Sequence, residues 1–302
     1  MKKIQGSKLV IIPLDQNNTC NYHSTNIYYK SNNVEYDFNF QLKEDSLLKK
    51  IFINKSEKIF MQAINNLYNN NNDCTLKLLR QINKEVDAKF LISILSSDMN
   101  EREKLIFEII NTNDPPGKYF HKFEITLKMD IDFSNNIIFS LYPDEIGINI
   151  LYAEILYYNG YKDKAIQILE KSNLLSEKII CLYLVNLYYE KKEYKKAIQI
   201  IQNSKQNSNC AEPINTISLL FLGKLLRKLK IHHSAIDIFR NCKRYNKNRS
   251  TDLILEGRYQ LGLTYELIGE EKLAIKEYEK ILAVNYDYRD VNQRLKQATN
   301  NF

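Results

Sequence analysis

From residue 145 to the end of the chain, apolar residues recur three and four positions apart, with only short interruptions. This spacing places apolar side chains on one face of a helix, so it predicts a succession of helices. Before residue 145 the pattern is mixed. Apolar and polar residues alternate over 34–42 and 122–133, as expected for strands, whereas residues 56–112 have helical spacing.

The mixed region, residues 1–142, is therefore expected to form an α+β domain. Its patterns predict antiparallel strands around 8–42 and 119–142, with four short helices inserted at 56–112. The alternative for the first two of these helices, with Ala63 and Leu79, is that they form a degenerate copy of the repeat found after residue 145. An isolated hairpin is marginally stable in water, so we expect both groups of strands to share one sheet. Residues 143–144, a proline and an aspartate, mark the predicted end of this domain.

The helical region that follows repeats its own pattern. A small residue, followed by isoleucine and by a large apolar residue four positions on, occurs at Ala165, Ala197, Ala235 and Ala274. Successive alanines are 32, 38 and 39 residues apart. Twelve positions before each of them lies another small or branched residue: Ala153, Val185, Gly223 and Gly262. Self-similarity of this kind indicates an array of helical hairpins.

With these residues, positions 146–288 resemble the tetratricopeptide repeat. The last copy matches the family pattern most fully, at Leu261, Gly262, Tyr265, Ala274 and Tyr278. The chain departs from the pattern at Arg258, Ile281 and Tyr286. The resemblance implies an all-α solenoid over 145–302, in which small residues let paired helices cross closely and aromatic residues fill the gap to the next hairpin.

The residues after the last copy are expected to cap the array, because a terminal repeat needs a polar outer face. A helix from Tyr288 to about Thr299 would turn Val291 inward and Arg289 and Asp290 outward.

The resemblance also implies a function, which is to bind a peptide or protein on the concave face lined by the first helix of each hairpin. In the family's register, the side chains expected to contact the partner are Glu154, Tyr157, Asn186, Tyr189, Lys224, Arg227, Tyr259 and Glu266. The alternative is that these residues only solvate a face or pack the superhelix. A clamp for a terminal carboxylate is not supported, because Ile150 and Glu154 stand where its first lysine and asparagine would lie.

The formal net charge is +7, but lysine and arginine are spread along the helices and alternate with glutamate. Solvated helix faces explain this pattern better than a nucleic-acid patch. Nucleic-acid association, and a ligand-binding or enzymatic N-terminal domain with the repeats as a docking arm, remain as alternatives to a non-enzymatic scaffold or adaptor.

Residues with possible chemistry are few: Cys20 with His23, the neighbours His232 and His233, and Asp130 with Asp132. No second cysteine–histidine pair follows at ligand spacing, and adjacent helix residues point apart. No catalytic residue, metal site or cofactor is therefore predicted.

The five cysteines are odd in number and scattered, and no apolar run is long enough for a membrane span or a signal peptide. We therefore expect a cytoplasmic protein.

Overall fold

The computed structural model describes residues 9–13, 26–29, 53–69, 71–112, 114–123, 125–134, 137–172, 174–204, 213–244 and 251–300. The chain forms two compact units, unit 1 (Met1–Leu174) and unit 2 (Leu175–Phe302). The boundary predicted at 143–144 falls inside unit 1. The strand pattern of 34–42 and the pair Cys20 and His23 lie outside the described residues.

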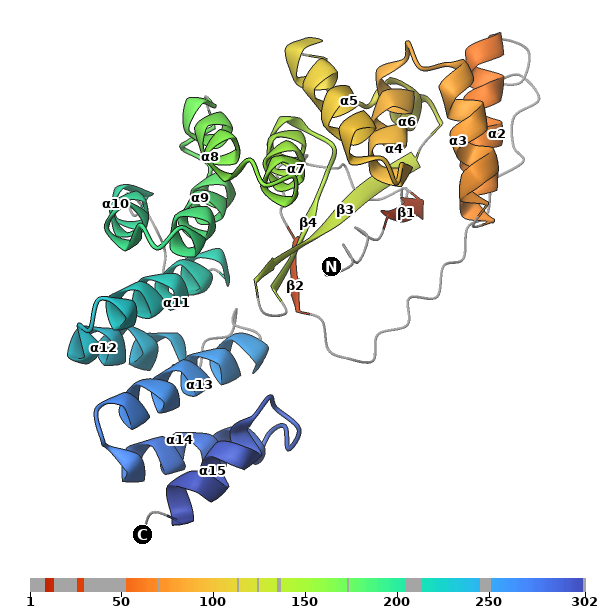
Figure 1. Ribbon diagram of the computed structural model, residues 1–302. Helices are drawn as coiled ribbons and strands as arrows, with labels where there is room; N and C mark the ends of the chain where they lie inside the picture. Colours follow the sequence, from red (N-terminus) through yellow and green to blue (C-terminus); the bar gives the residue numbers. More distant parts are fainter. Residues whose placement is uncertain are drawn as a thin grey trace. The chain divides into compact units, whose positions relative to one another are not determined.

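Unit 1 combines helices with a small sheet (Figure 1). Its elements are β1 (Leu9–Pro13), β2 (Asn26–Tyr29), α2 (Lys55–Tyr68), α3 (Asn72–Gln81), α4 (Val86–Leu95), α5 (Met99–Thr112), α6 (Lys118–Lys122), β3 (Ile125–Ser134), β4 (Ile137–Leu141), α7 (Glu145–Tyr158) and α8 (Lys162–Lys171). The four helices expected within 56–112 are thus confirmed as α2–α5.

The four strands form one antiparallel sheet in the order β1-β3-β4-β2. β3 and β4 make a hairpin in which Met129 lies opposite Leu141, and β1 adds to β3 with Ile11 opposite Leu127. The sheet therefore joins strands from within both of the segments, 8–42 and 119–142, for which strands were predicted. The first residue of β3, Ile125, and the last residue of β4, Leu141, are buried.

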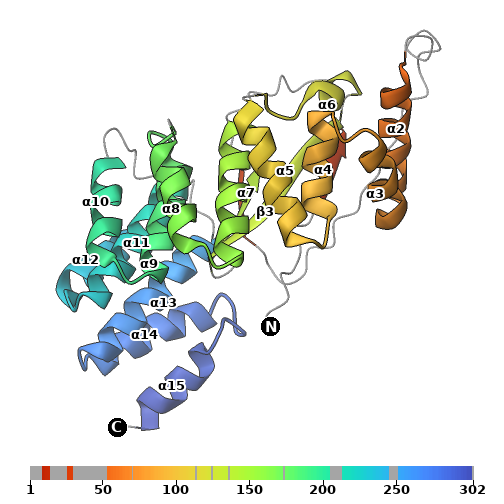
Figure 2. The same cartoon turned by 45° about the horizontal axis from the view of Figure 1, so that its top comes forward.

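The helices of unit 1 are themselves hairpins. α2 pairs with α3 and α4 with α5, and α5 in turn contacts α7, with which it lies side by side in Figure 2. The sheet and α6 are therefore additions to a helical array that begins at α2 and not at residue 145. For this reason a separate α+β domain over residues 1–142 is not supported; the packing of α2–α5 continues that of the predicted repeats.

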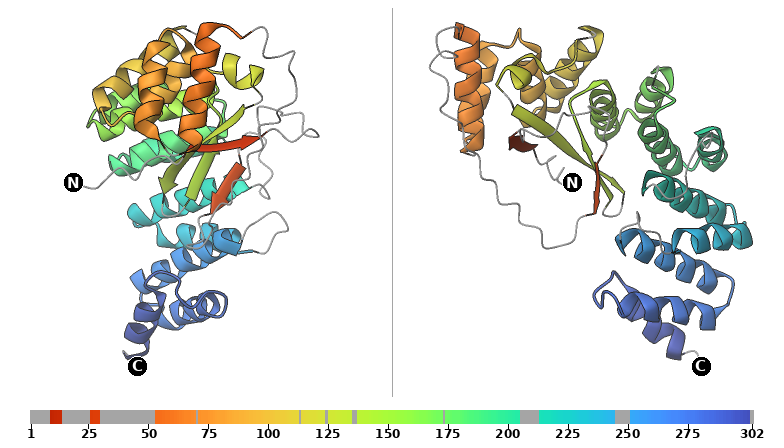
Figure 3. Two further views of the ribbon diagram at one scale, coloured as in Figure 1. Left: turned by 90° about the vertical axis from the view of Figure 1, so that its right-hand side faces the viewer. Right: turned by 180° about the vertical axis from the view of Figure 1, so that it is seen from behind.

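Unit 2 consists of hairpins stacked in sequence, as Figure 3 shows from two sides. Its helices are α9 (Lys178–Glu190), α10 (Tyr194–Ser204), α11 (Pro213–Lys228), α12 (His232–Cys242), α13 (Thr251–Leu267), α14 (Glu271–Leu282) and α15 (Val291–Asn300). α9 pairs with α10, α11 with α12 and α13 with α14, and α15 packs on α14 as the last helix. A helical solenoid is thus the fold of this region.

Small residues lie where the paired helices cross, as predicted. Two of the aromatic residues, Phe239 and Tyr278, pack on the glycine of their own hairpin. A Cβ atom at Gly223 would lie 2.4 Å from Cε1 of Phe239, and one at Gly262 would lie 2.4 Å from Cε1 of Tyr278. Where the small residue is larger, the partner position is aliphatic, as in Ala153 with Leu169 and Val185 with Ile201.

In the first hairpin, α2–α3, small buried residues also lie where the two helices cross. Ala63 and Thr75 are twelve positions apart and fully buried, and the Thr75 hydroxyl donates to the Ala63 carbonyl oxygen at 3.3 Å.

In the described part of the chain, no helix has both the length and the apolar character needed to cross a lipid bilayer.

Candidate partner-binding face

The first helices of the unit 2 hairpins, α9, α11 and α13, contact one another in succession. Their shared surface, together with residues 288–290 before α15, is called the inner face here. Six of the eight side chains predicted to bind a partner lie on these three helices: Asn186, Tyr189, Lys224, Arg227, Tyr259 and Glu266.

Lys224 is buried in an ion pair and is not presented to a partner. Its Nζ lies 3.2 Å from Oε1 of Glu256, and the two side chains are only 8% and 5% exposed. Glu256 also accepts hydrogen bonds from Gln260 Nε2 at 2.9 Å and the Tyr288 hydroxyl at 3.1 Å. Arg289 approaches its second oxygen at 2.7 Å. Glu256, which lies on α13, therefore contacts both α11 and the segment before α15.

The charge of Glu256 is maintained by these partners. Burial alone raises the pKa of this carboxyl, but the positive charges of Lys224 and Arg289 hold the pKa below its ordinary value. A buried ion pair of this kind contributes little net stability, yet removing one member leaves an uncompensated charge. The cluster therefore fixes how the last hairpins pack.

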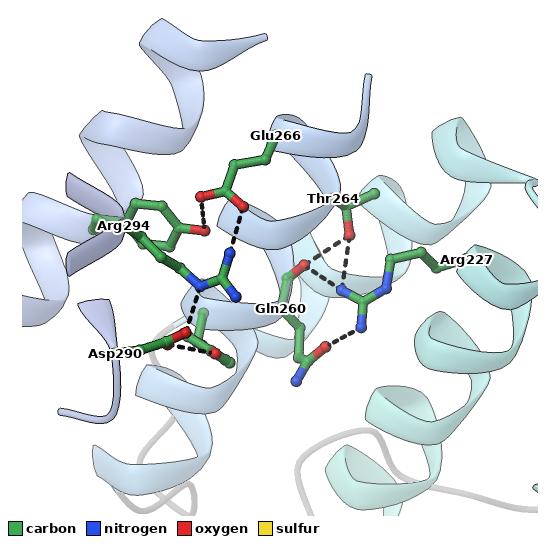
Figure 4. A network of polar contacts seen from close by, with 8 residues as sticks. Arg227, Gln260, Thr264, Glu266, Asp290 and Arg294 are labelled. Atoms are coloured by element: carbon green, nitrogen blue, oxygen red, sulfur yellow. Dashed lines mark hydrogen bonds and ion pairs between the residues drawn. The ribbon is translucent and has the colours of Figure 1, made fainter. Parts of the chain in front are cut away.

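Arg227 extends from α11 to α13 and is held there without a carboxylate. Its Nη1 donates to the Gln260 carbonyl oxygen at 3.1 Å and to Thr264 Oγ1 at 3.4 Å, and its Nη2 donates to Gln260 Oε1 at 2.6 Å (Figure 4). The guanidinium carbon also lies 5.7 Å from the centre of the Phe239 ring. Burial lowers the pKa of Arg227, because desolvation disfavours its charged form.

Tyr259 and Glu266 belong to a second polar network, centred on Arg294 (Figure 4). Arg294 donates from Nε to Asp290 at 2.9 Å and from Nη1 to Glu266 at 2.8 Å. The Tyr259 hydroxyl donates to Asp290 at 2.7 Å, and the Tyr278 hydroxyl donates to Glu266 at 2.8 Å. Burial raises the pKa of both tyrosines, and the hydrogen bonds to the carboxylates raise it further.

Tyr189 lies on α9, next to these networks. Its ring centre is 6.3 Å from that of Phe221 on α11 and 5.7 Å from that of Tyr194 on α10. Burial raises the pKa of Tyr189, and the positive charge of Arg227 partly opposes this effect, so the two groups are close enough to interact. Asn186, one turn earlier, is half-buried and engaged with neighbouring groups.

The other two predicted residues, Glu154 and Tyr157, lie in unit 1 on α7. Tyr157 packs against Tyr158, with 5.8 Å between ring centres, and Lys162 Nζ lies 5.0 Å above its ring. Glu154 is half-buried, and its charge acts on Arg102, whose pKa is lowered by burial.

Several residues of the inner face were not predicted from the sequence: Glu256, Gln260, Thr264, Asp290 and Arg294. The expectation that Arg289 and Asp290 point outward from a capping helix is wrong. α15 begins only at Val291, so both residues lie in the preceding turn, from which Arg289 reaches Glu256 and Asp290 accepts from Tyr259.

A signal for these contacts does exist in the sequence. Many of the pairs are separated by nearly one repeat: Lys224 and Glu256, Arg227 and Gln260, Lys243 and Glu277, and Tyr259 and Asp290. Such spacing brings equivalent positions of neighbouring hairpins together.

Residues suited to metal chemistry do not gather in the described ranges, where no three histidine, cysteine, aspartate or glutamate side chains are placed to hold an ion. His232 and His233 begin α12, as predicted.

No protein-family model matches the sequence, and no curated protein sequence matches it. Among solved structures, the chain is similar to the N-terminal domain of the EccA1 ATPase from the ESX-1 secretion system of Mycobacterium tuberculosis. The two are 14% identical, with a TM-score of 0.58 over 84% of this chain and 91% of that chain. It is also similar to the apo form of the quorum sensor NprR from B. thuringiensis, at 12% identity and a TM-score of 0.50 over 83% of this chain and 72% of that chain.

A weaker similarity links the chain to TTC0263, a tetratricopeptide protein of Thermus thermophilus. These two chains are 12% identical, with a TM-score of 0.41 over 81% of this chain and 98% of that chain.

The similar structures are of the tetratricopeptide type, so the resemblance in fold is shown. The first similarity covers 84% of this chain and therefore extends well beyond the predicted repeats, which agrees with the helical hairpins of unit 1. Tetratricopeptide-type folds serve in general as scaffolds for protein–protein interaction. At these low identities the fold alone carries over, and activities and partners do not.

Proposed function

We propose that the chain is a non-enzymatic interaction scaffold that holds an extended peptide segment of a partner protein on the inner face of unit 2. The observation that supports this proposal most directly is the composition of that face. It carries half-buried aromatic and cationic side chains, Tyr189 and Arg227, and Arg227 is held by the side-chain amide of Gln260. Tyrosine and arginine are the residue types that most often anchor protein interfaces.

The charge balance of the inner face favours a peptide over a nucleic acid. Lys224, Arg289 and Arg294 are each paired with a carboxylate. A nucleic acid would instead require a continuous positive surface along its phosphates.

Unit 1 has a secondary role in this proposal. Within unit 1, Glu154 and Tyr157 on α7 belong to a second surface for contact with a protein partner. The proposal assigns no chemical reaction to the chain, and it places the protein in the cytoplasm on the basis of its scattered cysteines.

The test is a selection of random dodecapeptides displayed on phage against the immobilised full-length protein. We expect a family of related peptides whose binding is lost in Tyr189→Ala. The matched control is Tyr286→Ala, because Tyr286 is 69% exposed and lies in the connector before α15. Both variants should melt at the wild-type temperature within a few degrees. If no related peptides emerge, or if both variants lose binding equally, the proposal fails.

A further inference from the structure

Most cations of the inner face are held in ion pairs. Lys224 and Arg289 lie within 3.2 Å of Glu256, and Arg294 lies within 2.9 Å of Glu266 and Asp290. Arg227, in contrast, has no carboxylate at ion-pair distance in the described part of the chain, and the negative charge of Glu256 acts on it only from farther away.

The hydrogen bonds of Arg227 use only part of its guanidinium. The Gln260 carbonyl oxygen and Thr264 Oγ1 accept from Nη1, and Gln260 Oε1 accepts from one N–H of Nη2. A guanidinium has five N–H donors, so the Nε–H and the second N–H of Nη2 remain. These two donors point the same way along one edge of the planar group. That edge matches the two oxygens of a carboxylate, which it can bind through two parallel hydrogen bonds.

The side chain is also fixed in position before any partner arrives. Gln260 holds its far edge through both the backbone and the side-chain oxygen, and Phe239 lies under its face. A pre-organised arginine loses little side-chain entropy on binding, so its hydrogen bonds contribute more to affinity.

We propose that Arg227 is the anchor of the peptide site and binds the carboxylate of an aspartate or glutamate side chain in the partner, through its Nε and Nη2 donors. This inference rests on the proposed peptide-binding function and specifies the chemistry of the peptide. A carboxylate is favoured over a phosphate, because a phosphate carries nearly two charges and would need further free cations, which the paired Lys224 and Arg289 do not offer.

The experiment extends the same peptide selection. Peptides that bind the wild-type chain should share one acidic position. Synthetic versions with aspartate replaced by asparagine, or glutamate by glutamine, should bind the wild-type protein at least about tenfold more weakly, as expected for loss of a charge-assisted pair. Because these changes are made in the peptide, the folding of a protein variant does not affect the result. In the protein, Arg227→Lys keeps the charge but removes the planar fork, and it should weaken the acidic peptide by a similar factor.

The outcomes separate the two proposals. If related peptides emerge without a shared acidic position, or if the amide versions bind equally well, the role of Arg227 is refuted while peptide binding stands. If amidation of the peptide's C-terminus weakens binding and the side-chain changes do not, the carboxylate is a chain end and the assignment to an acidic side chain is overturned. If no peptide is enriched, both proposals are refuted.

Discussion

The contact between Gly262 and Tyr278 allows a stringent test of how the hairpins pack. In Gly262→Ala, the new methyl carbon would lie 2.4 Å from Cε1 and 2.8 Å from Cζ of the tyrosine ring. Carbon atoms pack favourably only at about 3.5–4.0 Å, so the ring would have to move by about 1 Å. Tyr278 is fully buried, and its hydroxyl is held by Glu266 at 2.8 Å, so the ring has no space to move into.

Two effects of opposite sign determine the result. Alanine is favoured over glycine in a helix by about 1 kcal/mol, whereas overpacking a core costs about 1–3 kcal/mol. Because this clash is with a ring that cannot rotate away, we expect the upper part of that range. The net loss should be about 1–2 kcal/mol of the free energy of unfolding, although the helix propensity alone predicts a gain.

The assay is urea unfolding followed by circular dichroism, with hydrogen exchange of peptides from α13 and α14 as the local measurement. Tyr278→Leu should relieve the clash, so Gly262→Ala should cost less in the Tyr278→Leu background than in the wild type, by about 1 kcal/mol or more. Tyr278→Phe is the control that removes the hydroxyl and keeps the ring. If Gly262→Ala is as stable as the wild type, or if the two changes are additive, the packing argument is refuted.

Two further changes test buried charge. Glu256→Gln should destabilise unit 2 by about 3–5 kcal/mol, because it leaves Lys224 buried without its counter-charge. The double change with Lys224→Met should recover part of this loss in urea unfolding. A loss below about 1 kcal/mol for Glu256→Gln alone would contradict the expected cost of an unpaired buried charge. Asp87 is buried at α4 and accepts from the Tyr119 backbone N–H at 3.2 Å, and burial raises its pKa from 3.8 to about 6. The raised pKa of Asp87 therefore adds fully to the free energy of unfolding below pH 3.8, and this contribution of about 3 kcal/mol is lost as the pH rises through 6. Asp87→Asn should abolish this pH dependence, as unfolding curves between pH 4 and 7 would show.

The helical array could be predicted because its signal is local and repeated. Each hairpin requires small residues at fixed spacing, so Ala165, Ala197, Ala235 and Ala274 identify the crossings without any knowledge of distant contacts. The hairpin of α2 and α3 carries the same signal in a weaker form, since a threonine replaces the alanine at position 75. For that reason the clear repeats predict an array that begins at residue 145, and the strand patterns on either side of 56–112 predict a different fold for the first half.

The candidate site was predicted less well, because which side chains meet depends on how one hairpin rotates on the next. The family register places Lys224 and Arg227 on the first helix of their hairpin, and both lie on α11, but it could not show that Lys224 is buried against Glu256 or that Arg227 has no carboxylate at ion-pair distance. Arg258 illustrates the same point: it departs from the repeat pattern because Glu277, on the partner helix, pairs with it at 2.8 Å.

The cluster around Glu256 has a consequence for how unit 2 unfolds. In an ideal solenoid each hairpin adds its own increment of stability, and the ends fray first. Here one carboxylate connects a lysine of the second-to-last hairpin with an arginine and a tyrosine that follow the last one. If α15 detached together with Tyr288 and Arg289, the buried carboxylate of Glu256 on α13 would lose two of its partners. We therefore expect α13, α14 and α15 to unfold in one cooperative step, and α15 not to fray first.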